Sequence, residues 1–183
     1  ACGFTIQLSS QSTIQHYERA LNSVMSDNIC FPAKLVHSHI KELDEKGVER
    51  IFMPYVVYEK QDDKQTDNSF NCPIVSGYSD VIRSAMTINA SVDSPVINFS
   101  DEKLLRKQLT TYLKGLGVKT STCKRAIKEA LETKQETEAL LRQRNLEILS
   151  QSRKQGNITI LLAGRPYHTD PLVQHTDEWS PFS

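Results

Sequence analysis

The sequence predicts an α/β fold, in which a Rossmann-like, mostly parallel sheet is flanked by helices and one long helix precedes the last strand. Three observations lead to this class. Short apolar runs alternate with segments in which apolar residues recur every three or four positions. Residues 157–163 are largely apolar, as is typical of a central parallel strand buried on both faces. A long, charged helical segment at residues 121–155 comes directly before that run.

The first part of the chain is predicted to hold one strand and two helices. Residues 4–8 are the strand, and residues 12–24 are a helix capped by Ser10 or Ser12. Residues 31–46 are the second helix, because their apolar side chains recur at helical spacing. These side chains are Leu35, Val36, Ile40 and Leu43.

The middle of the chain continues the alternation. Gly47 ends the second helix, and residues 50–54 are predicted to form a short buried strand. Residues 60–69 are polar and without periodicity, so they are expected to form a loop. A helix over residues 77–86 and a strand over residues 95–99 follow.

Two further helices are predicted at residues 101–114 and 121–155, separated by Gly115 and Gly117. The longer one has two interpretations: it crosses between strands and packs one face against the sheet, or it offers a coiled-coil-like surface to a partner. Its small and apolar residues are Ala126, Ala130, Leu131, Leu140, Leu141 and Leu149.

Composition excludes several function classes. The chain has 183 residues, with 22 Lys and Arg against 22 Asp and Glu, so its formal net charge is +0. A nucleic-acid-binding protein would normally show a basic excess. No apolar run has the length needed to span a bilayer, and the first residues do not form a signal peptide. A cytoplasmic protein is therefore expected.

One domain over residues 1–175 and a tail at residues 176–183 are predicted. The last predicted strand is followed by no further helical pattern that would cover the sheet. We therefore expect the chain to be a piece of a longer protein, with a sheet that is incomplete at its ends.

Cys30 and Cys72 are the first candidate site. Each lies where a loop meets a predicted helix, and a helix N-terminus favours the negative charge of a thiolate. Loops at the carboxyl ends of parallel strands converge on one crevice, where both cysteines would meet. Two thiolates are only half of a usual zinc or iron–sulfur ligand set, and two small buried side chains are the alternative.

Two basic side chains follow Cys30 on the same predicted helix. Lys34 follows Cys30 by four residues and His37 follows Lys34 by three, so the three share a face, whereas His39 points elsewhere. His37 is a candidate for tuning a metal ligand, and Lys34 for offsetting negative charge. A structural histidine and a solvated lysine are the alternative interpretation.

A third group of polar residues follows the last predicted strand. Gly164 permits a tight turn, Arg165 is suited to phosphate or carboxylate, and His168 with Asp170 can form a hydrogen-bonded pair. The position at the end of a strand favours a ligand-binding role, although Arg165 pairing with a core carboxylate would give the same pattern.

Three strings in this order resemble one known family. They are CFPAKLVHSH at residues 30–39, NCPIVSGY at residues 71–78, and LAGRPYHTDP at residues 162–171. Over residues 4–175 the chain resembles the uncharacterised middle domain of CoA-substrate-specific enzyme activases, long proteins of anaerobic bacteria. Ser38 stands where family members usually have glycine.

The resemblance implies a function. The middle domain is similar to cluster-bearing subunits of 2-hydroxyacyl-CoA dehydratases, in which cysteines hold [4Fe–4S] clusters for low-potential electron transfer. Cys30 and Cys72 would then be metal ligands, with Lys34, His37, Arg165, His168 and Asp170 around them. Expected partners are ATP-hydrolysing activator domains and a dehydratase-like subunit, while ATP hydrolysis itself is not assigned to this chain. A non-catalytic scaffold that joins such domains is the alternative, and a small-molecule enzyme built on Arg165, His168 and Asp170 is a third hypothesis.

Overall fold

The computed structural model describes residues 2–61, 65, 67, 69–160, 164 and 172. The chain divides into two compact units, Gly3–Gly117 and a second one that begins at Val118 and takes in the first two residues. The prediction of one domain over residues 1–175 stays a prediction.

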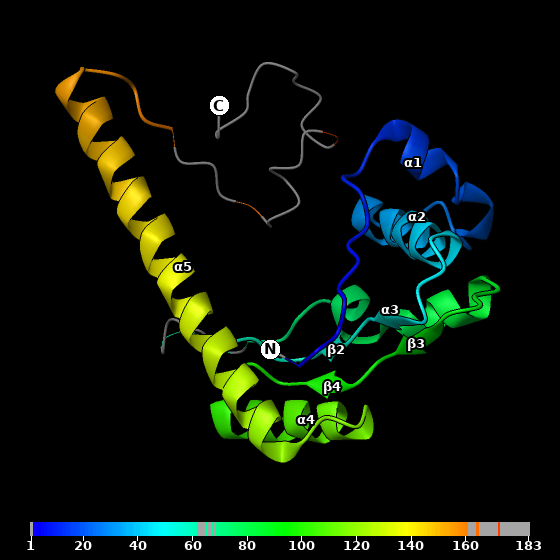
Figure 1. The fold of residues 1–183 in the computed structure, drawn as a ribbon. Helices are drawn as coiled ribbons and strands as arrows, with labels where there is room; N and C mark the ends of the chain where they lie inside the picture. Colours follow the sequence, from blue (N-terminus) through cyan, green and yellow to red (C-terminus); the bar gives the residue numbers. More distant parts are fainter. Residues whose placement is uncertain are drawn as a thin grey trace. The chain divides into compact units, whose positions relative to one another are not determined.

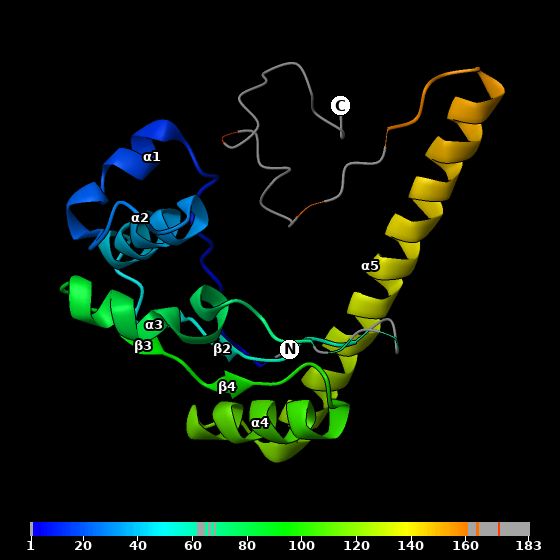
Figure 2. The same cartoon turned by 180° about the vertical axis from the view of Figure 1, so that it is seen from behind.

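The larger unit alternates helices with short strands (Figure 1). Its elements are α1 (Ile14–Glu18), the 3-10 helix η1 (Leu21–Ser23), α2 (Phe31–Glu45), β1 (Arg50–Phe52), β2 (Tyr55–Val56), α3 (Pro73–Ala85), β3 (Ser91–Asp93), β4 (Val96–Ile97) and α4 (Glu102–Gly115). The described part of the second unit consists mainly of α5 (Thr120–Lys154), the long helix that Figure 2 shows from behind.

The strands pair in parallel, as the sequence predicts. β1 pairs with β3 in the register Arg50 to Ser91, and β2 pairs with β4 in the register Tyr55 to Val96. Between the two ladders the Met53 amide donates to the Asp93 carbonyl at 2.8 Å. Parallel strands with helices between them confirm the predicted α/β class.

The core of this unit lies where α2 and α3 pack beside β1. Its buried side chains include Ala33 and Ile40 of α2, Ile51 of β1, and Tyr78 and Ile82 of α3. α2 begins and ends within one residue of its predicted limits, since its apolar residues do face this core. Gly47 follows with φ of 71°, a backbone conformation that glycine adopts without strain.

Several predicted elements differ from the structure. Residues 4–8 lie outside any strand, because no strand in the described part of the chain pairs with them, and their apolar side chains Phe4, Ile6 and Leu8 are exposed. The helix predicted at residues 12–24 is reduced to α1 and η1. Its cap is Thr13, whose side chain accepts a hydrogen bond from the His16 amide.

Proline explains two further differences. The helix predicted at residues 77–86 begins four residues earlier, at Pro73, because proline is well suited to a first helical position. The strand predicted at residues 95–99 is shortened to β4, which begins after Pro95 because proline has no amide hydrogen for a ladder, and β3 before it was not predicted.

α5 confirms the predicted long helix. Its buried residues are Cys123 and Ile127, both near its start, and it carries exposed ion pairs such as Lys128 with Glu132. Residues 157–160 after it lie outside any strand, and residues 161–163 are not among those described. None of the described helices is both long and apolar enough to cross a membrane.

Asp93 joins three elements of the larger unit. The Arg50 guanidinium of β1 donates to both carboxylate oxygens, at 2.8 and 3.0 Å, and the Tyr112 hydroxyl of α4 donates to one at 2.9 Å. Burial alone would raise the pKa of Asp93, but the hydrogen bonds from Tyr112 and Arg50 lower it below 3.8. Burial and the Asp93 carboxylate in turn raise the pKa of Tyr112 to about 12.

Replacing Tyr112 by phenylalanine is expected to lower the free energy of unfolding by about 1 to 3 kcal/mol at neutral pH, because a hydrogen bond to a charged group is lost. A lowered carboxylate pKa stabilises the folded state above the unfolded-state pKa and ceases to do so as the pH falls through the folded-state value. The difference between the two proteins should therefore shrink below pH 3.8. Urea unfolding at several pH values measures the difference in free energy between the two proteins, and Tyr55→Phe is the control. A difference that does not change with pH would contradict the prediction.

Candidate functional site

Two neighbouring helices of the larger unit each begin at a cysteine. Cys30 precedes α2 and Cys72 precedes α3, both with extended backbone. The Cys30 carbonyl accepts from the Ala33 amide at 3.0 Å, and the Cys72 carbonyl accepts from the Val75 amide at 3.0 Å. Neither helix has a side-chain hydrogen bond at its cap, so both thiols lie at an uncapped, partially positive helix end.

Local sequence accounts for these helix starts. Pro73 directly follows Cys72, and proline restricts the residue before it to extended backbone. Pro32 occupies the first turn of α2, where its missing amide hydrogen leaves no bond unmade. The prediction that both cysteines lie at helix N-termini is confirmed.

A cavity of about 310 Å³ is lined by the sequence neighbours of both cysteines, but by neither cysteine itself. Its wall includes Ile29, the residue before Cys30, and Pro73, the residue after Cys72. Most of its other lining is apolar, from Met25, Ile74 and Val81. Cys30 is exposed and Cys72 is half-buried, so neither matches the alternative of a fully buried thiol.

His37 is fully buried one helical turn beyond Lys34. Its Nδ1 lies 2.9 Å from Ser23 Oγ, and its Nε2 lies 2.9 Å from the Tyr78 hydroxyl. Burial lowers the pKa of His37, so the ring is neutral near pH 7. The Ser23 hydroxyl already donates to the Ala20 carbonyl at 2.7 Å. Nδ1 is therefore the donor to Ser23, and Nε2 accepts from Tyr78.

Tyr78 connects this histidine to the first cysteine. Burial raises the pKa of Tyr78, and the negative charge of a Cys30 thiolate raises it further. Tyr78 also lines the cavity. His37 and Tyr78 therefore form a hydrogen-bonded pair at the junction of α2 and α3, and the charge of Cys30 acts on Tyr78, with Lys34 half-buried on α2.

Arg165, His168 and Asp170 lie outside the described residues, so their convergence stays a prediction. Within the part of the chain that is described, no metal-compatible group of three His, Cys, Asp or Glu side chains contains a cysteine. The cysteines thus offer two ligands, and their role in metal binding stays a prediction.

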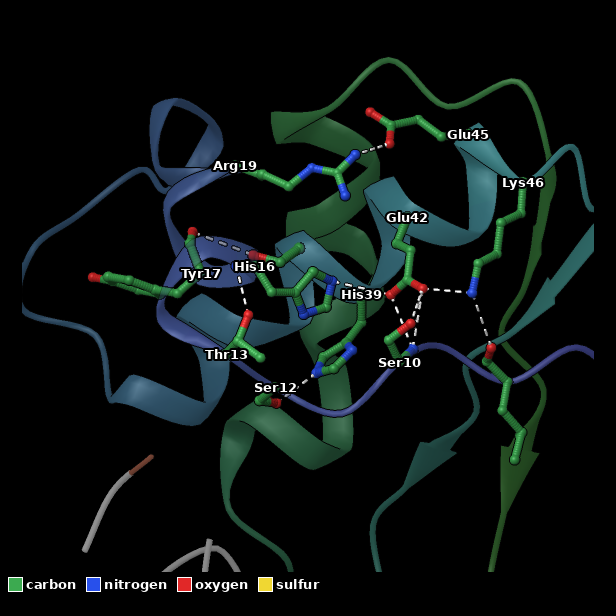
Figure 3. Close-up of polar contacts among 12 residues, drawn as sticks. Ser10, Ser12, Thr13, His16, Tyr17, Arg19, His39, Glu42, Glu45 and Lys46 are labelled. Atoms are coloured by element: carbon green, nitrogen blue, oxygen red, sulfur yellow. Dashed lines mark hydrogen bonds and ion pairs between the residues drawn. The ribbon is translucent and has the colours of Figure 1, made fainter. Parts of the chain in front are cut away.

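A second polar cluster was not predicted. His16 of α1 lies with His39 and Glu42 of α2, and one potential ligand atom from each lies within 4.8 Å of the others (Figure 3). The carboxylate of Glu42 also accepts from the Ser10 amide at 3.0 Å and from Lys46 Nζ at 2.5 Å. The hydrogen bonds from Lys46 and Ser10 lower the pKa of Glu42 to about 2, although burial opposes them.

Only part of this cluster has a signal in the sequence. The spacing of His39 and Glu42, three residues apart on a helix, places them on one face, and His39 was correctly expected to point away from Cys30. His16 comes from another helix, and nothing in the spacing indicates that it packs there.

Fold and site together define an α/β module whose accessible reactive groups, among the residues described, include two cysteine thiols at adjacent helix starts. The chain belongs to the family described as the CoA enzyme activase uncharacterised domain, whose profile matches residues 1–176. The resemblance seen in the three sequence strings is thereby confirmed. No match is found among curated proteins or among solved structures.

Proposed function

We propose that this domain holds an iron–sulfur cluster for low-potential electron transfer within a CoA enzyme activase, with Cys30 and Cys72 as two of the cluster ligands. The observation that carries the proposal is the placement of both cysteines at the uncapped starts of α2 and α3, two helices that contact each other. Iron–sulfur clusters in proteins are held mainly by cysteine thiolates.

The surroundings of the two thiols support this role. An uncapped helix N-terminus stabilises negative charge on a thiolate, and both cysteines lie at one. Hydrogen bonds and solvent exposure set the potential of a bound cluster. The Tyr78 hydroxyl is hydrogen-bonded to His37, and the negative charge of Cys30 raises its pKa. Tyr78 is therefore suited to adjust the reduction potential of a bound cluster.

Two thiolates make up half of a four-cysteine ligand set. The other ligands would come from a second copy of the chain, from another domain, or from a partner. The family is described as one domain of CoA enzyme activases, so other domains are expected to work beside it. We propose ATP-hydrolysing activator domains as the electron source and a dehydratase-like subunit as the acceptor.

Anaerobic reconstitution with iron and sulfide tests the proposal. The full-length protein should bind iron and give an electron paramagnetic resonance signal on reduction, whereas this chain alone, which supplies two of four ligands, is expected to lack the cluster. Cys30→Ala and Cys72→Ala should each lose most of the iron, because either change leaves one thiolate where two are required. Cys2→Ala is the matched control and should keep it. Absence of iron in the parent, or equal iron in all three variants, contradicts the proposal.

A scaffold that joins neighbouring domains is the second candidate. It is favoured by the apolar side chains that α5 exposes on one face, among them Leu141 at 53% and, two turns later, Ile148 at 46% exposure. Such a helix face is typical of a surface that binds another protein. Iron-free protein that still binds a dehydratase-like subunit would favour the scaffold over the cluster-bearing module.

A further inference from the structure

The cluster of His16, His39 and Glu42 is separate from the cavity lined by Ile29 and Pro73, since none of its residues lines that cavity. It lies within the larger unit, between α1 and α2. Figure 3 shows the His16 ring pointing toward the Glu42 carboxylate, with the His39 ring below it beside Ser12. The centroids of the two imidazole rings are 4.7 Å apart, and the rings are inclined by 74°.

The distances suit a small metal ion. Two ligand atoms that each lie about 2.0 Å from a tetrahedral zinc ion are about 3.3 Å apart. His16 Nε2 and Glu42 Oε2 are already separated by 3.1 Å. All three potential ligand atoms lie within 4.8 Å of one another, so the widest separation would have to shorten by at most about 1.5 Å.

His16 is the least satisfied member of the cluster. Its side chain is 7% exposed, and neither ring nitrogen makes a hydrogen bond to any of the residues described. Nε2 is close to Glu42 but lies outside hydrogen-bond geometry. A buried polar group without a hydrogen bond destabilises the folded state. A bound cation would satisfy this nitrogen.

We propose that His16, His39 and Glu42 bind a divalent transition-metal ion, best matched by Zn²⁺, with a fourth position open to water. Two imidazoles and one carboxylate are a ligand set that zinc accepts, and they leave the coordination sphere incomplete. The alternative is that the three side chains form a metal-free polar contact.

Neighbouring serines hold two of the ligands in place. Ser12 Oγ lies 3.1 Å from His39 Nε2, and the Ser10 hydroxyl donates to Glu42 Oε1 at 2.5 Å. Metal-binding histidines and carboxylates commonly have such outer hydrogen bonds, which orient them toward the ion. Lys46 occupies the Oε1 side of Glu42, whereas Oε2 faces His16. Oε2 also accepts from the Ser10 amide at 3.0 Å, and its second lone pair remains for the proposed ion.

The test uses the full chain with Cys30 and Cys72 both changed to serine, so that these two thiols do not contribute. Titration calorimetry with Zn²⁺ should show one ion per chain. His39→Gln and Glu42→Gln should each weaken binding by at least about 10-fold. Glu45→Gln, on the same helix but in an exposed ion pair with Arg19, is the matched control and should bind like the parent.

Two further measurements keep the test decisive if a variant folds poorly. Circular dichroism identifies such a variant, and the half-exposed His39 is the position expected to tolerate substitution. Zn²⁺ should raise the unfolding temperature of the parent and of Glu45→Gln, but not that of His39→Gln. Bound Co²⁺ should give visible bands without a thiolate charge-transfer band. Equal Zn²⁺ affinity of the parent and folded His39→Gln overturns the proposal, as does the absence of one-to-one binding.

Discussion

Replacing His37 by leucine is expected to lower the free energy of unfolding by about 2 to 5 kcal/mol. Leucine fills a similar volume but removes both hydrogen bonds of the ring. The Tyr78 hydroxyl would lose its acceptor and Ser23 would lose its donor within a buried region. A buried polar group that loses its partner costs more than the hydrogen bond itself contributed.

Denaturant unfolding of the chain, followed by circular dichroism, measures this change. Tyr78→Phe and Ser23→Ala each remove one of the two hydrogen bonds and should cost about 0.5 to 2 kcal/mol. If the network acts as a unit, combining Tyr78→Phe with His37→Leu should cost less than the sum of the two. A His37→Leu variant as stable as the parent would show that the ring does not hold α2 and α3 together.

Replacing Ile82 by alanine is expected to cost about 2 to 5 kcal/mol, because the change removes buried methyl groups and leaves a cavity. Ile82 has 0% exposure on α3 and packs in the core that α3 shares with α2 and β1. Close-packed interiors relax only partially around such a loss.

The graded variant Ile82→Val should cost only about 0.5 to 1.5 kcal/mol, since it removes a single methylene. Val75, on the same helix but 44% exposed, supplies the control Val75→Ala, which should change stability by less than about 0.5 kcal/mol. Comparable losses for Ile82→Ala and Val75→Ala would contradict the placement of Ile82 in the core. Urea unfolding at neutral pH distinguishes these outcomes.

The sequence predicted helix α2 correctly but wrongly predicted a strand at residues 4–8, because a helix depends on local sequence and a strand depends on a partner. The apolar residues of α2 recur over several turns and Gly47 follows them, so local sequence alone determines the element. Residues 4–8 carry β-type side chains, but a strand exists only when another strand supplies hydrogen bonds. That partner is a property of the whole fold, which a local pattern does not contain.

Part of the candidate site could likewise be predicted from the sequence, and part could not. Cys30 and Cys72 were found from sequence because each lies where a loop meets a predicted helix, although the start of the second helix at Pro73 was missed. Tyr78, the residue that connects Cys30 to His37, was missed, although it stands within one of the family-like strings. Its contact with His37 spans 41 residues of sequence, so only tertiary packing reveals it.

The parallel ladders have a consequence for how the chain acquires its structure. β1 pairs with a strand whose matching residue, Ser91, comes 41 positions after Arg50, and α3 lies between them. Closing so long a segment costs chain entropy before any ladder hydrogen bond forms. During synthesis β1 and β2 emerge from the ribosome well before β3 and β4. α2 and the turn around Ser23, only 14 residues from His37, are therefore expected to assemble first, and the sheet closes last.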